Sequence, residues 1–294
     1  MTYSEHSFWS DPKGYATALT DLPTTPDALP DALEEFLIHH AAARAMGFGV
    51  PDYAETDRSL RSVARLLHTA FGRDPRSLMQ HRDLPHYLYG TCHDFSLIAA
   101  SVLRSAGWEV RLRVGFVDYL KPGYWEDHWV CEYRAEGEWR LLDGQLGRRA
   151  RDGFGIAFDP ADVPRSGFLS GPEMWLALRS GEVDPDRCGV SFAGIAGAWF
   201  AGSNVLKDLA ALTVVEVLPW DFWGPSRVFC ESQAVDSESA VRLDQLAAAL
   251  TPAPDSLEDA LAISDRFPWA KPTDRVWSFF DGRLHQQAVR PETP

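Results

Sequence analysis

The sequence contains few cysteines, and no two of them lie close together. Its 294 residues include only Cys92, Cys131, Cys188 and Cys230, none of which forms a CxxC pair. A disulfide framework or a zinc ribbon needs more numerous or more closely spaced cysteines. We therefore expect four free thiols and no metal site, so each cysteine has to be explained singly.

Long apolar runs and an excess of basic residues are also missing. No stretch approaches the roughly 20 apolar residues of a membrane-spanning helix, and the first twelve residues show no basic-then-apolar targeting pattern. The chain carries 28 Lys and Arg against 42 Asp and Glu, a formal net charge of −14. These absences argue against nucleic acid or a membrane surface as a partner, and they favour a cytoplasmic protein.

No glycine-rich loop has the spacing that cradles a phosphate, because the glycines of 194–202 are irregularly placed. We expect neither a nucleotide nor any other cofactor. What the sequence does have is an ordinary hydrophobic content of 45% and eleven tryptophans. Aromatic side chains of this kind build cores and line concave sites.

The apolar periodicity predicts helices first and an antiparallel meander after them, which together indicate an α+β fold. The helices are expected at 32–46, 57–71 and 92–106, with glycines at 47 and 107 as stops. A half-buried strand at 110–117 follows, and then a hairpin of 127–134 and 138–144. Residues 1–30 are expected to form an irregular arm and 72–89 a loop.

The second half of the chain is less regular. Short helices are predicted at 173–179 and 204–212, a strand at 214–218, two helices at 237–250 and 256–266, and a polar tail. Three segments result: an N-terminal arm and helix (1–56), a catalytic core (57–150), and a C-terminal extension packed on the core (151–294).

One stretch points to chemistry. In Gly90-Thr91-Cys92-His93-Asp94-Phe95-Ser96, a cysteine stands where a loop turns into a helix. A thiol attacks a carbonyl carbon as its thiolate, and the amide groups and dipole of a helix N-terminus favour an anion. A histidine that accepts the thiol proton completes such a nucleophile, and backbone N–H groups can stabilise an oxyanion.

The hairpin supplies candidate partners for this cysteine. A turn centred between residues 135 and 136 would pair Val130 with Leu141 and place His128 opposite Asp143, with Cβ atoms about 5 Å apart. In this hypothesis Cys92 attacks the carbonyl carbon, His128 transfers the proton, and Asp143 orients the imidazole.

Other interpretations of the same residues exist. A cysteine at a helix start is often a small buried hydrophobe, and Asp143-Gly144 alone is typical of a turn. A zinc site built from Cys92, His93, His128 and Cys131 lacks a short chelating pair. The order of the cysteine, histidine and aspartate, together with their placement, favours the catalytic interpretation.

At these residues the sequence resembles the transglutaminase-like superfamily, which has a papain-like cysteine fold. The resemblance rests on the Cys92 stretch, residues 107–116, Asp127-His128-Trp129-Val130 and the segment 139–143, about residues 60–145 in all. Residues 197–221 resemble the C-terminal part of a bacterial transglutaminase-like subgroup.

The resemblance implies a helix that carries Cys92 packed on an antiparallel sheet that carries His128 and Asp143. It also implies a thioester acyl-enzyme that an amine or water resolves. Calcium-site signatures and flanking immunoglobulin-like domains are not evident, which argues against protein cross-linking. A buried, aromatic-rich pocket in a single compact chain favours a small molecule or short peptide as the substrate. The expected substrate contacts are Tyr89, Trp125, Trp199 and Asp221. The alternatives are a cysteine protease and a non-catalytic binding protein that keeps the fold.

Overall fold

The computed structural model describes residues 2–45, 50–280 and 282–290. The chain forms two compact units, one of residues 3–112 and 130–164, the other of residues 113–129 and 165 onward. The fold is mixed, with helices and three sheets in the described part of the chain.

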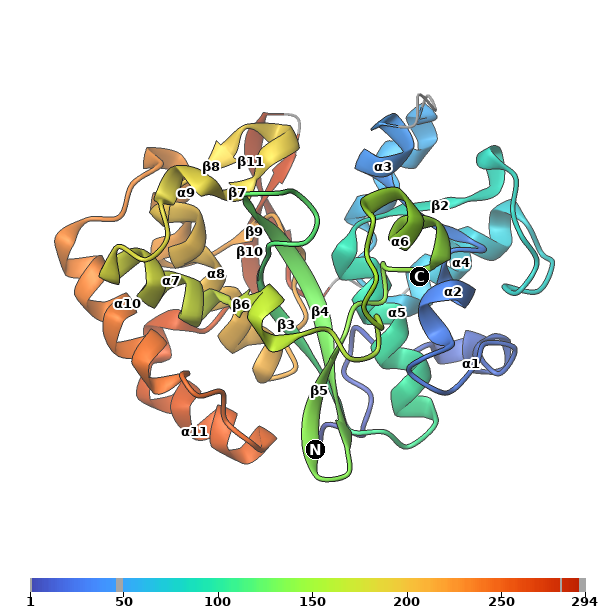
Figure 1. Ribbon diagram of the computed structural model, residues 1–294, viewed down its shortest axis with the longest axis horizontal. Helices are drawn as coiled ribbons and strands as arrows, with labels where there is room; N and C mark the ends of the chain where they lie inside the picture. The colour runs from blue at the N-terminus through green and yellow to red at the C-terminus, as the bar shows by residue number, and fades with distance from the viewer. Residues whose placement is uncertain (1, 46–49, 281, 291–294) are drawn as a thin grey trace. The chain divides into compact units, whose positions relative to one another are not determined.

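In the unit of residues 3–112 and 130–164, α5 (Cys92–Ser105) packs against α2 (Leu29–Leu33) and α4 (Val63–Arg73) (Figure 1). The predicted helix at 57–71 is confirmed from Val63 onward, as α4, and the predicted helix at 92–106 is confirmed as α5. Gly107 ends α5 with φ +87°, as expected of a stop. The unit's other elements are α1 (Ala16–Leu19), β1 (Leu37–His39), α3 (His40–Ala45), β2 (Leu88–Gly90), β5 (Glu138–Leu142), α6 (Arg148–Phe154), and 3-10 helices at Lys13–Tyr15, Asp52–Ser59 and Leu84–His86.

The prediction of one helix over residues 32–46 is wrong. The chain leaves α2 and forms strand β1, which pairs in parallel with β2. Pairing with a distant segment decides the conformation, because Leu88 N donates to Phe36 O at 2.9 Å and Leu37 to His39 pair with Leu88 to Gly90. The predicted stop at Gly47 lies outside the described residues.

Strands β3 (Val110–Val117) and β4 (Trp125–Ala135) are central to a six-stranded sheet of order β6-β3-β4-β7-β8, with β5 also paired to β4. Both strands confirm the predicted positions. The expectation that β3 is half-buried is wrong, because all eight of its residues are buried. The sheet is also not purely antiparallel, since β4 and β7 (Cys188–Val190) run in parallel.

In the other unit, the 15-residue helix α8 (Ala198–Leu212) packs against α7 (Gly171–Ser180), α9 (Pro225–Ser232) and α10 (Ser237–Ala249) (Figure 1). Asp208 of α8 fixes this helix to β3 by accepting hydrogen bonds from Arg113 Nε (3.0 Å), Arg113 Nη2 (2.9 Å) and Val114 N (2.9 Å). The remaining elements are β6 (Phe168–Ser170), β8 (Ile195–Ala196), β9 (Asp221–Phe222), α11 (Leu257–Arg266), β10 (Arg275–Phe280), β11 (Arg283–Ala288), and 3-10 helices at Arg165–Gly167, Pro185–Arg187, Ser191–Ala193 and Pro268–Ala270.

Two predictions for this unit fail. Residues 214–218 form no strand; Val214 instead leaves α8 with φ +54°. The predicted polar tail contains the hairpin β10–β11, which joins β9 in a three-stranded sheet. The helices predicted at 173–179, 237–250 and 256–266 are confirmed as α7, α10 and α11, and α8 begins six residues before the predicted 204.

Candidate active site

Cys92 is the first residue of α5 and is 7% exposed. Thr91 precedes it in an extended conformation (φ −129°, ψ 175°), which makes the entry into the helix sharp. Asp94 Oδ2 accepts hydrogen bonds from Thr91 N (2.8 Å) and Thr91 Oγ1 (3.1 Å), while Phe95 N donates to Thr91 O (3.2 Å). This capping arrangement fixes the first turn, where helical N–H groups and the dipole favour negative charge.

Gly90 is required by the close packing of this turn. A Cβ built on Gly90 would lie 2.8 Å from Leu37 Cδ1 and 2.9 Å from Asp94 Oδ2. Since the Asp94 carboxylate also caps the helix, a side chain at position 90 displaces the cap. The glycine is thus tied to the placement of Cys92.

We expect Gly90→Ala to lower the free energy of unfolding by about 1–2 kcal/mol, the usual range for a lost cap. Urea unfolding of the purified protein measures it. Gly72→Ala is the matched control, because Gly72 lies within α4 and a Cβ there meets nothing within 4 Å. Alanine is the better helix former, so the control gains stability or keeps it. Equal losses in both variants would contradict the role given to Gly90.

Asp143 follows β5 directly, but the predicted hairpin register is wrong. Cys131 pairs with Leu142, and Leu141 pairs with Glu132 rather than with Val130. The turn is the cause. Glu136 (φ +53°) and Gly137 (φ +86°) form a tight two-residue connection between Ala135 and Glu138. His128 and Asp143 are therefore not a cross-strand pair of the ladder, which ends at Leu142.

Asp143 is fully buried, and its Oδ1 accepts a hydrogen bond from Gln145 N (3.0 Å). Its own N–H donates to Pro160 O (2.8 Å). The next residue contacts α5, because a Cβ on Gly144 would lie 3.3 Å from the Phe95 carbonyl oxygen. The turn that carries Asp143 thus packs on the first turns of the helix that Cys92 begins.

Strand β4 contacts α5 at the same level. Cys131 Sγ donates a hydrogen bond to the Ser96 carbonyl oxygen at 3.1 Å. Ser96 is one helical turn beyond Cys92. Within this unit, the strand and the turn after β5 both meet α5 close to its N-terminal end.

His128 belongs to β4 and is 1% exposed. The ring of Tyr119, from the loop between β3 and β4, stands edge-on to the imidazole with ring centroids 6.3 Å apart. Sequence reasoning did not identify Tyr119. It precedes Lys121-Pro122-Gly123 in a turn, and nothing in its local pattern indicates a histidine contact.

A buried polar network adjoins His128 in the sequence. Asn204 Nδ2 of α8 donates to Asp127 Oδ1 (2.6 Å), and Lys207 Nζ donates to Asn204 Oδ1 (3.3 Å) and to Pro219 O (2.5 Å). Desolvation raises the pKa of Asp127 to about 6, against the lowering effects of the Lys207 charge and the Asn204 hydrogen bond. The residue as a whole is half-buried, while its carboxyl group is desolvated.

The other three cysteines lie in surroundings that do not favour a thiolate. Burial raises the pKa of Cys188 to about 12 and also raises that of Cys230. Cys131 is fully buried and uses its S–H as a donor, which requires the neutral thiol. Cys92 is the cysteine that begins a helix.

Of the four predicted substrate contacts, two are polar side chains held in internal hydrogen bonds and two are tryptophans. Tyr89 is buried and its hydroxyl donates to Leu84 O (2.8 Å), while the buried Asp221 accepts from Leu218 N and from Ser278 Oγ. Trp125 is half-buried at the start of β4. Trp199 lies in the first turn of α8 and donates from Nε1 to Ala196 O (2.9 Å).

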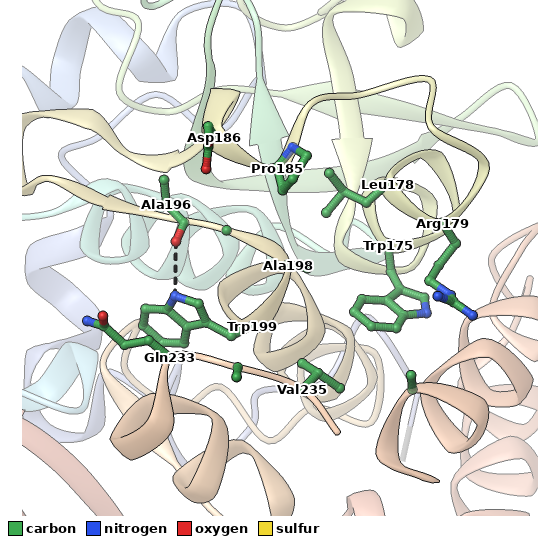
Figure 2. A pocket seen from close by; sticks show the side chains of 13 residues that line it. Trp175, Leu178, Arg179, Pro185, Asp186, Ala196, Ala198, Trp199, Gln233 and Val235 are labelled. Atoms are coloured by element: carbon green, nitrogen blue, oxygen red, sulfur yellow. Dashed lines mark hydrogen bonds between the residues drawn. The ribbon is translucent and has the colours of Figure 1, made fainter. Parts of the chain in front are cut away.

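Trp199 lines a cavity of about 420 Å³. Figure 2 shows Trp175, Leu178 and Arg179 of α7 around it, together with Trp199. Arg179 pairs with Asp244 Oδ1 at 3.0 Å, so its charge is compensated. The cavity has the size of a small-molecule site, and Arg179, Asp186 and Gln233 add polar groups to its aromatic and aliphatic walls.

Two further observations concern the described residues as a whole. They contain no group of three or more His, Cys, Asp or Glu side chains placed to hold a metal ion. Nor does any helix within 2–45, 50–280 and 282–290 combine the length and apolar character needed to cross a membrane.

Comparison with known proteins gives little. No protein-family model and no curated protein matches the sequence. Among solved structures, a "Putative Cysteine Protease" from Cytophaga hutchinsonii aligns with a TM-score of 0.35 and 14% identity, over 57% of this chain and 44% of that one. The chain thus spans less than half the length of that structure, and a TM-score of this size does not establish a shared fold.

Proposed function

We propose that the protein is a cysteine-dependent acyl-transfer enzyme, either a hydrolase or an amide-forming transferase, with Cys92 as its nucleophile. The observation that carries the proposal is the placement of Cys92 as the first residue of a capped 14-residue helix. Such a position favours the thiolate and offers backbone N–H groups for an oxyanion.

In this proposal His128 and Asp143 complete the site. The support for Asp143 is that the turn after β5 meets α5 at Phe95, within about one helical turn of Cys92. Asp143 immediately precedes the Gly144 of that contact, and His128 is proposed as the buried histidine of β4 that follows Cys92 in the sequence. The shifted hairpin register does not remove this support, because the turn on α5 rather than the ladder carries Asp143.

The proposed reaction has two stages. His128 takes the proton of the Cys92 thiol, and the thiolate attacks the carbonyl carbon of an amide or ester. The carbon–nitrogen or carbon–oxygen bond breaks, the leaving group takes the proton from His128, and a thioester remains. Water or an amine then attacks the thioester, releasing an acid or an amide and restoring the thiol. Asp143 orients the imidazole throughout.

We propose a small molecule or short peptide as the substrate class, with Trp125 and Trp199 as contacts. Within its own unit Trp199 lines a cavity of about 420 Å³, a volume in the range of small-molecule sites. Tyr89 and Asp221 are left out, since their polar groups are engaged in internal hydrogen bonds.

Site-resolved alkylation tests the proposal. We expect iodoacetamide to modify Cys92 rapidly at pH 7, below the ordinary thiol pKa of about 8.5. Cys188 and Cys230 serve as internal controls, because burial raises the pKa of both. Peptide mass spectrometry at several times and at pH 5–9 gives a rate for each thiol.

The variant His128→Ala separates an activated nucleophile from a merely accessible one. We expect it to slow Cys92 alkylation at pH 7 by about 100-fold, the scale of general-base assistance. If Cys92 reacts no faster than Cys230 in the parent protein, the catalytic proposal fails and a binding role for the fold becomes the better hypothesis.

A further inference from the structure

The residue before His128 is tied to helix α8 by a chain of hydrogen bonds. Asp127 Oδ1 accepts from Asn204 Nδ2 at 2.6 Å, and Asn204 Oδ1 accepts from Lys207 Nζ at 3.3 Å. Asn204 and Lys207 are 0% and 1% exposed. Because a carboxylate lies on one side of the amide and an ammonium group on the other, the orientation of the Asn204 amide is fixed by its two neighbours.

The Lys207 ammonium group has further contacts besides the one with Asn204. Its ammonium group donates to Pro219 O at 2.5 Å and lies over the rings of Phe222 (4.7 Å) and Phe200 (5.3 Å). Burial lowers the pKa of the Lys207 ammonium group, while the Asp127 charge, the carbonyl acceptor and the cation–π contacts favour its charged form. Burying an ammonium group costs a desolvation free energy that an apolar side chain would not cost.

Several charged groups surround the network. Glu126 and His128 flank Asp127 on β4, and Lys207 faces it from α8; Lys207 is itself near Asp221 of β9 and Cys230 of α9. Glu126 is engaged elsewhere, since it accepts from Ser191 N at 3.0 Å. His128 and Lys207 both favour the ionised form of Asp127, and an ionised Asp127 in turn favours the protonated imidazole.

We infer that Asp127 is a positioning residue for His128, and that the Asn204–Lys207 pair of α8 holds it in place. This inference rests on the proposed function. The carboxylate fixes the segment of β4 that carries the imidazole, and its charge stabilises the imidazolium that forms when the Cys92 proton is taken. Neighbouring side chains of a strand point to opposite faces, so Asp127 acts through the backbone and its charge rather than by touching the substrate.

The ionised carboxylate is the working form, which sets the sign of the pH dependence. The pKa of Asp127 is about 6. Its assistance is therefore present above pH 6 and is lost as the pH falls through 6. We expect Asp127→Asn to slow Cys92 alkylation about 10-fold at pH 7.5, the lower end of the effect of orienting partners. The variant is also expected to lack the fall in rate that protonation of Asp127 causes near pH 6.

The experiment measures Cys92 alkylation by peptide mass spectrometry at pH 5–8 in four proteins: the parent, Asp127→Asn, Asp127→Glu and Asp265→Asn. Asp265 is the matched control, since it is an exposed aspartate paired with a lysine, Lys271, at 2.5 Å. Asp127→Glu keeps the charge, so its Cys92 alkylation rate is expected to lie closer, on a logarithmic scale, to that of the parent than to that of Asp127→Asn. Urea unfolding of each variant checks that the fold is retained.

The outcomes separate the two proposals. The inference is overturned if the Cys92 alkylation rates of Asp127→Asn and Asp265→Asn agree within about twofold. The proposed function still stands in that case if Cys92 of the parent protein reacts fast and depends on His128. The inference is also overturned if Asp127→Asn slows alkylation equally at every pH and Asp127→Glu does not restore the rate, because Asp127 then has only a structural role. A parent in which Cys92 reacts no faster than Cys230 removes the proposed function, and the positioning role with it.

Discussion

Replacing Cys92 with serine is expected to reduce turnover of an activated ester, such as p-nitrophenyl acetate, by about 10³-fold or more, to the background rate. A serine hydroxyl at this place is a far weaker nucleophile than a thiolate, and loss of a nucleophile removes nearly all covalent catalysis. The substitution changes one buried atom at the start of α5, so the fold is retained. Steady-state release of p-nitrophenol measures the effect.

Cys188→Ser is the control for this substitution. Cys188 is buried and its thiol pKa is raised to about 12, so its removal leaves the rate unchanged. Loss of activity in the control, or retention of most activity in Cys92→Ser, would show that ester turnover does not pass through Cys92.

Removing Asp208 is expected to have the largest effect on stability. Its carboxylate accepts two hydrogen bonds from Arg113 and one from Val114 N, and Asp208 and Arg113 are 0% and 3% exposed. Asp208→Ala leaves the buried guanidinium without its carboxylate partner. We expect a loss of about 3–5 kcal/mol in the free energy of unfolding. Urea unfolding followed by tryptophan fluorescence measures it.

An exposed ion pair of the same unit gives the comparison. Glu231 pairs with Arg227 at 3.0 Å on α9, and the two side chains are 48% and 39% exposed. Glu231→Ala is expected to cost no more than about 0.5 kcal/mol, because an exposed i,i+4 pair is weak. Similar losses in Asp208→Ala and Glu231→Ala would contradict the structural role of the buried pair.

The helix that begins at Cys92 could be predicted because all of its signals are local. Apolar residues recur at helical spacing, Thr91 and Asp94 stand at capping positions, and Gly107 ends the helix. The strands of the hairpin were predicted for the same reason. The register was not, because it depends on Glu136 adopting φ +53°, which a glutamate rarely does. A two-residue turn of this kind has a weak signal without Asn or Asp at its first position.

Elements that depend on distant partners were predicted poorly. Leu37–His39 forms a strand only because β2, about fifty residues later, pairs with it. The apolar run 214–218 has β-branched residues, but none of the strands in the described part of the chain pairs with it, and Val215 N instead donates to Ala210 O. The C-terminal hairpin did carry a usable signal, since residues 281–282 of the sequence are Asp-Gly, a dipeptide typical of hairpins.

The polar surroundings of His128 lay beyond sequence reasoning as well. Asp127 and Asn204 are 77 residues apart, and neither stands in a motif that relates them. Glu126-Asp127 looks like ordinary surface charge in the sequence. Only the packing of α8 in its unit shows that the carboxyl group of Asp127 meets a buried amide and a buried ammonium group.

The most direct test of the central claim is to locate the acyl group. The protein is mixed with p-nitrophenyl acetate at pH 7, quenched in acid within seconds, and digested for peptide mass spectrometry. We predict one acetyl group per chain, on Cys92, that hydroxylamine removes and that does not form in Cys92→Ser. Acetyl groups spread over lysines at equal rates in the parent and in Cys92→Ser would contradict acyl transfer through Cys92.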